Sequence, residues 1–208
     1  MKECPVIFNG EMVRAILDGR KTQTRRVIAN VGPDNCIPLQ KPTKTKDGIY
    51  THVMDAPGHG LCPFGQVGDR LWVRETFQGP LIPEDELSEY LGANPDKFQS
   101  PAYCEYAADG GAKPEYVDSD ENTRYGWRPS IHMPRWASRI TLEITAVRVE
   151  RLQDISKADS IAEGGTEHFN IDWFGPLWAS IYGVDSWNAN PWVWVIEFKQ
   201  VSAREVEQ

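Results

Sequence analysis

The chain has 208 residues, a formal net charge of -8, and 40% hydrophobic and 25% charged residues, a composition typical of a globular protein with one sizeable core. The acidic total excludes a protein that coats nucleic acid with its whole surface, because such binding depends on neutralising many phosphates. The sequence contains no apolar run of membrane-spanning length and no recognisable signal peptide. We therefore expect a cytoplasmic protein without membrane contact.

The first predicted elements are a short strand over CPVIF and a helix capped by Asn9. Gly19 ends the helix at a position that suits a left-handed residue. From residue 22 to 28 the pattern changes to that of a strand, so Lys21 lies at a helix-to-strand corner. Four apolar residues form the buried stripe of the helix: Met12, Val13, Ile16 and Leu17.

The middle of the chain begins with a long loop at 30–66, followed by an expected strand from Leu71 to Phe77. Gly68-Asp69 is expected to form the turn before that strand. Further expected segments are a weak strand at 49–54, a helix at 83–91, a strand at 102–107 and irregular acidic chain at 109–122.

The last third begins with the longest strand signal, at 138–152, where the apolar residues change face near Thr145-Ala146. Two short helices are expected at 154–165 and 172–183, and an apolar strand at 191–201 should lie inside a sheet. Strands at both ends with short helices between them favour an α+β fold, a small mixed β-barrel with helices at its rim.

The stretch ILDGRKTQTRR concentrates basic residues around two threonines. In a strand, Thr22, Thr24 and Arg26 share one face, and Lys21 at the corner can fold over them. A threonine hydroxyl becomes a nucleophile when a base takes its proton, and a lysine is such a base if burial or neighbouring cations lower its pKa from about 10.4. The alternative is an ordinary turn with solvated charges.

A carboxylate stands in an otherwise apolar row of the strand LWVRETF. Leu71, Val73, Glu75 and Phe77 share one face, so Glu75 is expected to be buried and to need a cationic partner. Lys21, or an arginine of the motif, is the natural choice. The alternative is that Trp72 marks the core face and Glu75 is exposed.

Residues 124–139, RYGWRPSIHMPRWASR, combine arginines with aromatic residues and contain no acid. This combination holds phosphates and stacks bases in single-stranded or flipped-out nucleotides. In the alternative, the tryptophans pack in the core and the arginines pair with the acidic segment before them.

Cysteines and histidines give no compact metal-binding pattern. His52, His59 and Cys62, with Cys36 upstream, have side chains that suit zinc, but their spacing matches no finger. The four cysteines form no CxxC pair and are expected to be free thiols. We therefore expect neither a metal nor a cofactor.

The string Gly19 to Arg26, GRKTQTRR, resembles the signature of the ASCH domain, a PUA-like β-barrel, with the pattern G-x-K-x-x-E-x-R. Thr24 stands where many members carry Glu, a variant found in small bacterial enzymes of the acetylcytidine amidohydrolase type. The resemblance implies a catalytic set of Lys21, Thr24 and, on a later strand, Glu75. It extends to the turn at Gly68-Asp69 and to a late helix of the form S-x-x-D-[AS]-x-x-E-G, approached by Ser156–Gly164.

Longer strings, such as GDRLWVRETF and NPWVWVIEF, are similar to ASCH-like proteins of tailed phages and prophages. The resemblance implies a single ASCH, PUA-like domain over 1–202 with insertions at about 30–66 and 78–130, followed by a flexible tail at 203–208.

The leading hypothesis is a phage or prophage protein that binds RNA or a modified nucleotide in a basic cleft. One alternative is an amidohydrolase that deacylates a modified cytidine, with Thr24 as nucleophile and Lys21 as base. The other two alternatives are a metal-dependent ribonuclease and a non-catalytic phage interaction protein. The residues expected to contact the ligand are Gly19, Arg20, Arg25, Arg26, Arg74, Trp127, Arg128, His132, Arg135 and Trp136.

Overall fold

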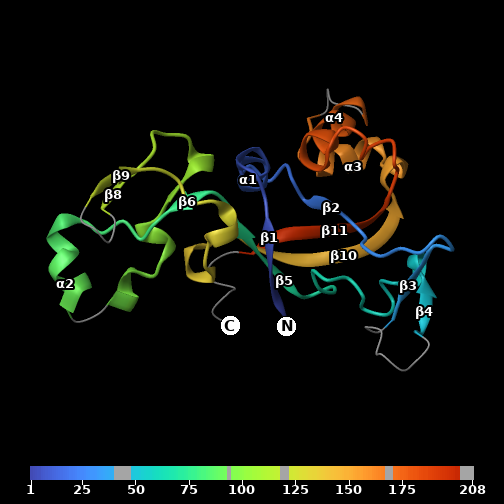
Figure 1. The fold of residues 1–208 in the computed structure, drawn as a ribbon, viewed down its shortest axis with the longest axis horizontal. Helices are drawn as coiled ribbons and strands as arrows, with labels where there is room; N and C mark the ends of the chain where they lie inside the picture. Colours follow the sequence, from blue (N-terminus) through green and yellow to red (C-terminus); the bar gives the residue numbers. More distant parts are fainter. Residues whose placement is uncertain (40–47, 93–94, 118–121, 167–170, 202–208) are drawn as a thin grey trace. The chain divides into compact units, whose positions relative to one another are not determined.

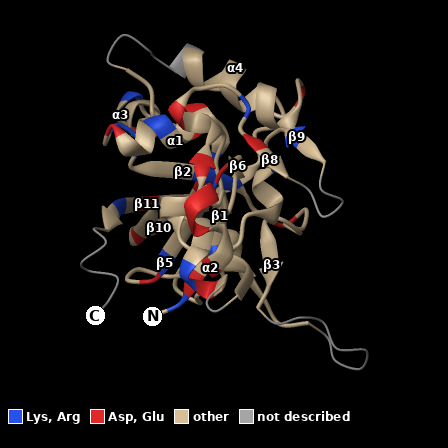
Figure 2. Cartoon of the chain, turned by 90° about the vertical axis from the view of Figure 1, so that its left-hand side faces the viewer, with Lys and Arg blue, Asp and Glu red and all other residues tan. Residues whose placement is uncertain are grey.

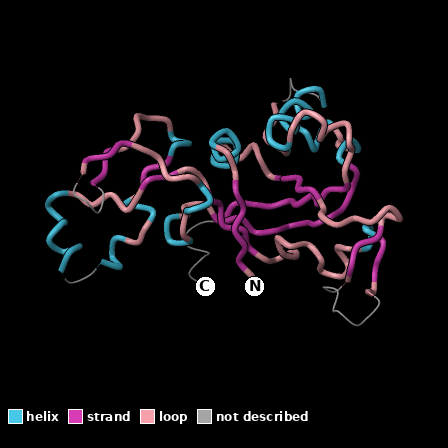
Figure 3. Tube along the Cα trace, in the orientation of Figure 1, coloured by secondary structure: helices cyan, strands magenta, loops and turns pink. Residues whose placement is uncertain are grey.

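The computed structural model describes residues 1–39, 48–92, 95–117, 122–166 and 171–201 (Figure 1). Figure 3 shows helices, strands and loops alternating along the chain. In chain order the elements are β1 Glu3–Ile7, α1 Gly10–Leu17, β2 Gln23–Val27, β3 Cys36–Pro38, β4 Tyr50–His52, β5 Arg70–Arg74, β6 Phe77–Gln78, α2 Leu87–Gly92, β7 Glu105–Tyr106, β8 Glu115–Val117, β9 Thr123–Tyr125, β10 Thr141–Arg151, α3 Lys157–Ala162, α4 Ile171–Tyr182 and β11 Trp192–Val201.

Five strands form one sheet in the order β1-β5-β10-β11-β2, and the other strands pair as β3-β4, β6-β7 and β8-β9. The expected α+β class is confirmed, since a multi-stranded sheet is combined with a few short helices. The expected barrel is not closed: within the described residues, the sheet has β1 and β2 as its two edges. None of the described helices is long and apolar enough to cross a membrane.

Backbone contacts divide the chain into two compact units. The first unit consists of Met1–Cys4, Ala15–Leu71 and Leu142–Val201. The second unit, within the described residues, consists of Pro5–Arg14 and Trp72–Thr141. The predicted insertion at 30–66 belongs to the first unit and the one at 78–130 to the second. The predicted tail at 203–208 lies outside the described residues.

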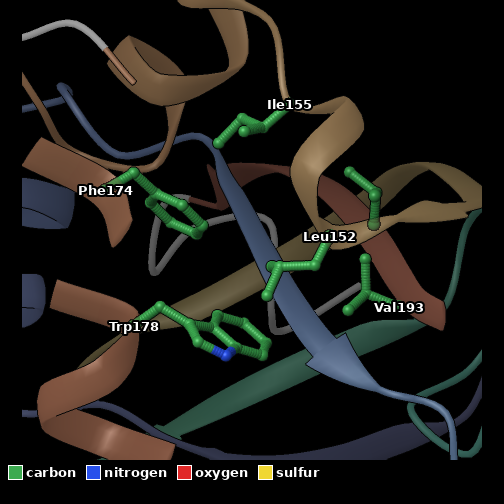
Figure 4. Close-up of a cluster of buried hydrophobic side chains, with 6 residues drawn as sticks. Leu152, Ile155, Phe174, Trp178 and Val193 are labelled. Carbon is green, nitrogen blue, oxygen red and sulfur yellow. The ribbon is translucent and has the colours of Figure 1, made fainter. Parts of the chain in front are cut away.

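The core of the first unit lies between α4 and β11. Figure 4 shows Phe174 and Trp178 projecting from α4 toward Leu152 and Val193. These residues are at most 3% exposed, and Ile155 completes the labelled cluster. The strand β11 is buried on both faces from Val193 to Ile196, and it lies between β10 and β2 in the sheet. Its predicted place inside the sheet is confirmed.

The core of the second unit is built around Phe77, with Tyr106, Met133 and Ala137 packed against it. Val73 is also buried, at 1% exposure. The predicted burial of Leu71, Val73 and Phe77 is confirmed. The expected continuous strand from Leu71 to Phe77 is wrong, because β5 ends at Arg74 and β6, which pairs in another sheet, begins at Phe77.

The local signals in the sequence located several elements correctly. Asn9 caps α1, with its Oδ1 accepting the Met12 backbone N–H at 2.9 Å. Ser156 and Asp159 form the capping box that starts α3. The buried face of α1 differs in one residue, since Leu17 is 42% exposed and Ala15 is buried in its place.

Two segments of the second unit differ from the prediction. The expected strand at 102–107 is a 3-10 turn at Pro101–Tyr103 followed by β7, which pairs only with β6. The expected irregular chain at 109–122 contains β8, which pairs with β9. Strands of two or three residues are too short to show an alternating apolar pattern in the sequence. Whether such a segment forms a strand depends on the segment with which it pairs.

Candidate functional site

The corner between α1 and β2 places the basic motif. Gly19 has a φ of +72°, a left-handed conformation that glycine adopts without strain, and it reverses the chain after the helix. The Ala15 carbonyl oxygen then accepts the backbone N–H groups of Arg20 and Lys21, at 2.8 and 2.9 Å. These hydrogen bonds fix Lys21 immediately before β2.

Lys21 is a buried lysine whose carboxylate partner is Glu163. Its Nζ donates to Glu163 Oε2 at 2.7 Å and to the Glu163 carbonyl oxygen at 2.8 Å. The side chains of Lys21 and Glu163 are 0% and 4% exposed. Glu163 is the C-cap of α3, and the Thr22 backbone N–H donates to the Ala162 carbonyl at 2.9 Å. Backbone and side chains together therefore join the motif to the end of α3.

Arg25 extends the same cluster along β2. Its Nη1 donates to Glu163 Oε1 at 3.1 Å, and its Nη2 donates to Glu150 and lies 3.6 Å from Asp159 Oδ2. The guanidinium lies 5.7 Å from the ring centroid of Phe174. With a side chain that is 0% exposed, Arg25 is a structural cation of the core.

Arg148 of β10 closes the cluster on its solvent side. It donates to Asp159 Oδ1 at 2.7 Å, to Glu150 Oε2 at 3.3 Å and to Glu197. Its Nη2 also donates to Gln23 Oε1 at 3.3 Å. Figure 2 shows both basic and acidic residues on the α3 part of the ribbon.

The charges of the motif are thus largely balanced inside the protein. The cluster contains three cations and four carboxylates: Lys21, Arg25 and Arg148 with Glu150, Asp159, Glu163 and Glu197. Arg20 pairs with Asp18 at 2.9 Å and donates to the Gly164 carbonyl at 3.0 Å. A phosphate at this position would have to compete with these carboxylates, so the geometry does not favour a phosphate clamp.

Burial lowers the pKa of Lys21 below its ordinary value. The charge and hydrogen bond of Glu163 act in the opposite direction, and the charges of Arg26 and Arg25 lower the pKa further. Lys21 is therefore closer to the neutral amine, the form that accepts a proton, than an exposed lysine is.

Thr24 lies in the middle of β2, 3% exposed and opposite Ile196 of β11. Side chains alternate along a strand, so Thr24 points away from the face on which Gln23 and Arg25 meet the carboxylates. Arg26 follows on the Thr24 side and is half-buried.

Glu75 is buried as predicted, at 2% exposure, but it belongs to the second unit and pairs with Arg139. Its two carboxylate oxygens accept Arg139 Nε at 2.9 Å and Nη2 at 3.0 Å. Arg139 also donates to Asp109, at 2.8 and 2.7 Å, and lies 3.9 Å from the ring centroid of Tyr106. Burial raises the pKa of Glu75, although Arg139 acts to lower it.

The arginine and tryptophan residues proposed as a stacking wall also belong to the second unit. Trp72 is half-buried, and the guanidinium carbons of Arg74 and Arg135 lie 5.4 and 6.0 Å from its ring centroid. Trp136 packs against the core of the second unit. Trp127 is half-buried, and Arg128 and His132 are exposed.

The residue that the sequence interpretation missed is Glu163. A signal was present, because Glu163 is the E of the pattern S-x-x-D-[AS]-x-x-E-G at the end of the predicted helix. The choice of Glu75 instead rested on its buried row, which the structure confirms. The apolar row indicates that the Glu75 carboxylate is buried and needs a cationic partner, but it does not indicate which cation that partner is.

A cavity of about 300 Å³ opens beside the charged cluster in the first unit. Its walls come from the start of β2, from β10, from β11 and from α3. They consist of Thr22, Gln23, Thr145, Ala158, Asp159, Ala162, Glu197 and Phe198. A second cavity, of about 250 Å³, lies against Cys62 and Val147, and burial raises the pKa of the Cys62 thiol.

Of the residues considered for zinc, Cys36 of β3 and His52 of β4 lie opposite each other. His52 Nδ1 accepts the Met54 backbone N–H at 3.3 Å, and Cys36 Sγ lies 3.7 Å from the Asp34 carbonyl. In the described part of the chain, no group of three or more metal-binding side chains is gathered.

Comparison with known proteins adds no relative: no family, no curated protein and no solved structure matches this chain. Functional inference therefore depends on the site itself.

Proposed function

We propose that the protein is a PUA-like protein of the ASCH type, of the kind encoded by tailed phages, and that it is an amidohydrolase acting on acylated cytidine. The observation that carries this proposal is the buried Lys21–Glu163 pair within the motif Gly19 to Arg26. Ionisable groups with strongly perturbed pKa values concentrate at functional sites. The direction of the Lys21 shift is the one that a general base requires.

In the proposed reaction, the Lys21 amine takes a proton from a water molecule while the water oxygen attacks the acyl carbonyl carbon. Thr24, the expected nucleophile, points away from the face on which Lys21 and Arg25 meet Glu163, so it has no part in this step. The bond from the carbonyl carbon to the exocyclic nitrogen breaks, and Lys21 returns the proton to that nitrogen, which releases cytidine and a carboxylic acid. Glu163 holds the lysine, a role that we had expected of Glu75.

The test is hydrolysis of acetylcytidine by the purified protein, followed by chromatography of the released cytidine. Lys21→Met should abolish turnover and keep nucleoside binding, whereas Thr24→Ala should leave turnover in place. Glu163→Gln removes a charge that raises the Lys21 pKa, so the acid limb of the rate profile should move to lower pH. Glu75→Gln is the matched control and should leave that limb in place. Absence of turnover on any acylated cytidine by folded wild-type protein would sink the proposal.

Nucleic-acid binding is a second candidate function, favoured by the arrangement of Arg74 and Arg135 around Trp72 in the second unit. Arginine beside an exposed aromatic edge suits a single-stranded nucleic acid, whose bases stack and whose phosphates need cations. Fluorescence anisotropy with single-stranded RNA should show affinity that falls steeply with salt and is weakened by Arg135→Ala. Arg20→Ala, in the first unit, is the control, and equal loss in both variants would contradict this function.

A further inference from the structure

Two of the four cysteines are buried in the same part of the first unit. Cys4 of β1 and Cys62, in the loop before β5, are 8% and 5% exposed, and both are free thiols. Cys4 Sγ donates to the Pro63 carbonyl oxygen at 3.9 Å, so it lies beside the residue that follows Cys62. The fold therefore brings together two thiols that are far apart in the sequence.

The turn after Cys62 directs hydrogen-bond donors at the sulfur of this residue. Burial raises the pKa of the Cys62 thiol, whereas the backbone N–H groups of Phe64 and Gly65 donate to the sulfur and act in the opposite direction. The charge of Cys4 raises this pKa further and the charge of Lys2 lowers it, so both groups lie near the thiol. N–H donors and a neighbouring cation stabilise the thiolate, which is the form that binds metal ions.

A cavity of about 250 Å³ gives access to Cys62. Its walls are largely apolar, with Val67 and Val147 among them, and it opens to solvent where Gln66 and Val67 are exposed. Among the residues that line it there is neither a histidine nor an acid, and the described segments of the chain gather no group of three or more metal-binding side chains. An ion bound to Cys62 can therefore take Cys4 as its second protein ligand and finds no third.

The number and type of ligands decide which metal ion such a site suits. Structural zinc takes four ligands, and calcium and magnesium take oxygen ligands, so two thiols suit none of these ions. Soft thiolate ligands select Cu(I). Cu(I) bound by two thiolates carries one net negative charge, and the nearby Lys2 ammonium has the opposite sign.

We propose that Cys4 and Cys62 form a two-coordinate site for Cu(I), a soft monovalent metal ion, which enters through the cavity beside Cys62. Each thiol loses its proton as the ion binds, so two S–H bonds break, two sulfur–copper bonds form, and two protons pass to solvent. No electron is transferred in this step. The site uses neither Lys21 nor Glu163, so it does not depend on the proposed amidohydrolase activity.

The experiment is an anaerobic titration with Cu(I), in competition with a coloured Cu(I) chelator of known affinity. The double variant Cys36→Ser/Cys104→Ser removes the other two thiols of the chain and is the matched control, which should bind Cu(I) as tightly as wild type does. Cys4→Ser and Cys62→Ser should each weaken binding at least about hundredfold, because loss of a ligand costs more than loss of a group that only orients one.

A measurement on the double variant covers the case in which serine at a buried position prevents folding. The remaining thiols of Cys36→Ser/Cys104→Ser are Cys4 and Cys62, so X-ray absorption at the copper edge should show two sulfur ligands in this variant. A copper ion with more than two ligands, or one held by nitrogen and oxygen alone, would overturn the assignment.

Two outcomes of the titration would also overturn the site. Wild-type affinity in folded Cys4→Ser or Cys62→Ser would mean an adventitious ion only. Loss of binding in Cys36→Ser/Cys104→Ser would place the ion on the other two cysteines.

Discussion

Replacing Glu163 by Gln tests the pairing of Lys21 directly, because the variant keeps the shape of the side chain and removes its charge. Glu163 lies 2.7 Å from Lys21 Nζ and 3.1 Å from Arg25 Nη1, and both cationic side chains are 0% exposed. Arg25 retains Glu150 and Asp159, whereas Lys21 loses the carboxylate closest to its amine. The electrostatic loss should therefore fall mainly on Lys21.

Breaking a buried ion pair by removing one partner costs about 3–5 kcal/mol. We expect the free energy of unfolding of Glu163→Gln to fall by about 3 kcal/mol, the lower end, since glutamine can still accept a hydrogen bond from Lys21. The assay is urea denaturation at pH 7 of Glu163→Gln, Lys21→Met and the double variant. The double variant removes both charges, so its loss should be smaller than the sum of the single losses by about 2 kcal/mol.

Glu143→Gln serves as the control, because its pair with Lys199 is exposed, with side chains 32% and 61% accessible. Such a pair contributes about 1 kcal/mol or less. Additive losses in the cycle would refute the coupling of Lys21 to Glu163. A loss in Glu163→Gln no larger than that in Glu143→Gln would refute the argument from burial.

Three further predictions concern other parts of the chain. Arg139→Met leaves Glu75 buried without its bidentate partner and should lower the free energy of unfolding by about 3–5 kcal/mol in urea denaturation, while a loss no larger than that of Arg139→Lys would contradict the bidentate pairing. The lowered pKa of Lys21 means that the unfolded chain holds this proton more tightly, so stability should rise with pH from the folded pKa to 10.5, and Lys21→Met should reduce that rise. Gly19→Ala places a side chain at φ +72° and should lower the free energy of unfolding by about 1 kcal/mol, measured by thermal unfolding. Gly10→Ala, at the first residue of α1 and with ordinary contact distances, is the control and should leave stability unchanged. Equal losses in the two variants would contradict the argument from backbone strain at Gly19.

The charge balance around β2 changes the interpretation of the motif. By sequence alone, Arg20, Lys21 and Arg25 are expected to belong to a basic cleft. In the folded chain, each of these cations has a carboxylate within 3.1 Å. Two of the carboxylates come from distant parts of the sequence: Glu163 from the C-cap of α3 and Glu150 from β10. The motif therefore contains an ordered, buried lysine, and its positive charges are neutralised by the protein's own carboxylates.

Local features of this chain could be predicted from its sequence because their causes are local. The cap at Asn9, the turn at Gly19, the alternation along β2 and the buried row containing Glu75 each depend on residues a few positions apart. Features that depend on distant residues could not be predicted in this way. The strand β8 was missed because it depends on pairing with β9, and the strand expected at 102–107 was too long, because only the residues of β7 pair with β6.

The sequence alone determined that Lys21 stands at a helix-to-strand corner, and it offered burial of Glu75 as one of two alternatives. Only the tertiary structure decided which carboxylate belongs to which cation: Glu163 to Lys21, across 142 positions, and Arg139 to Glu75, across 64. Either carboxylate satisfies the requirement that a buried lysine be paired, and periodicity carries no information about which one approaches it. The choice is made by α3, which ends at the backbone of Lys21 and leaves Glu163 within hydrogen-bonding distance of the amine.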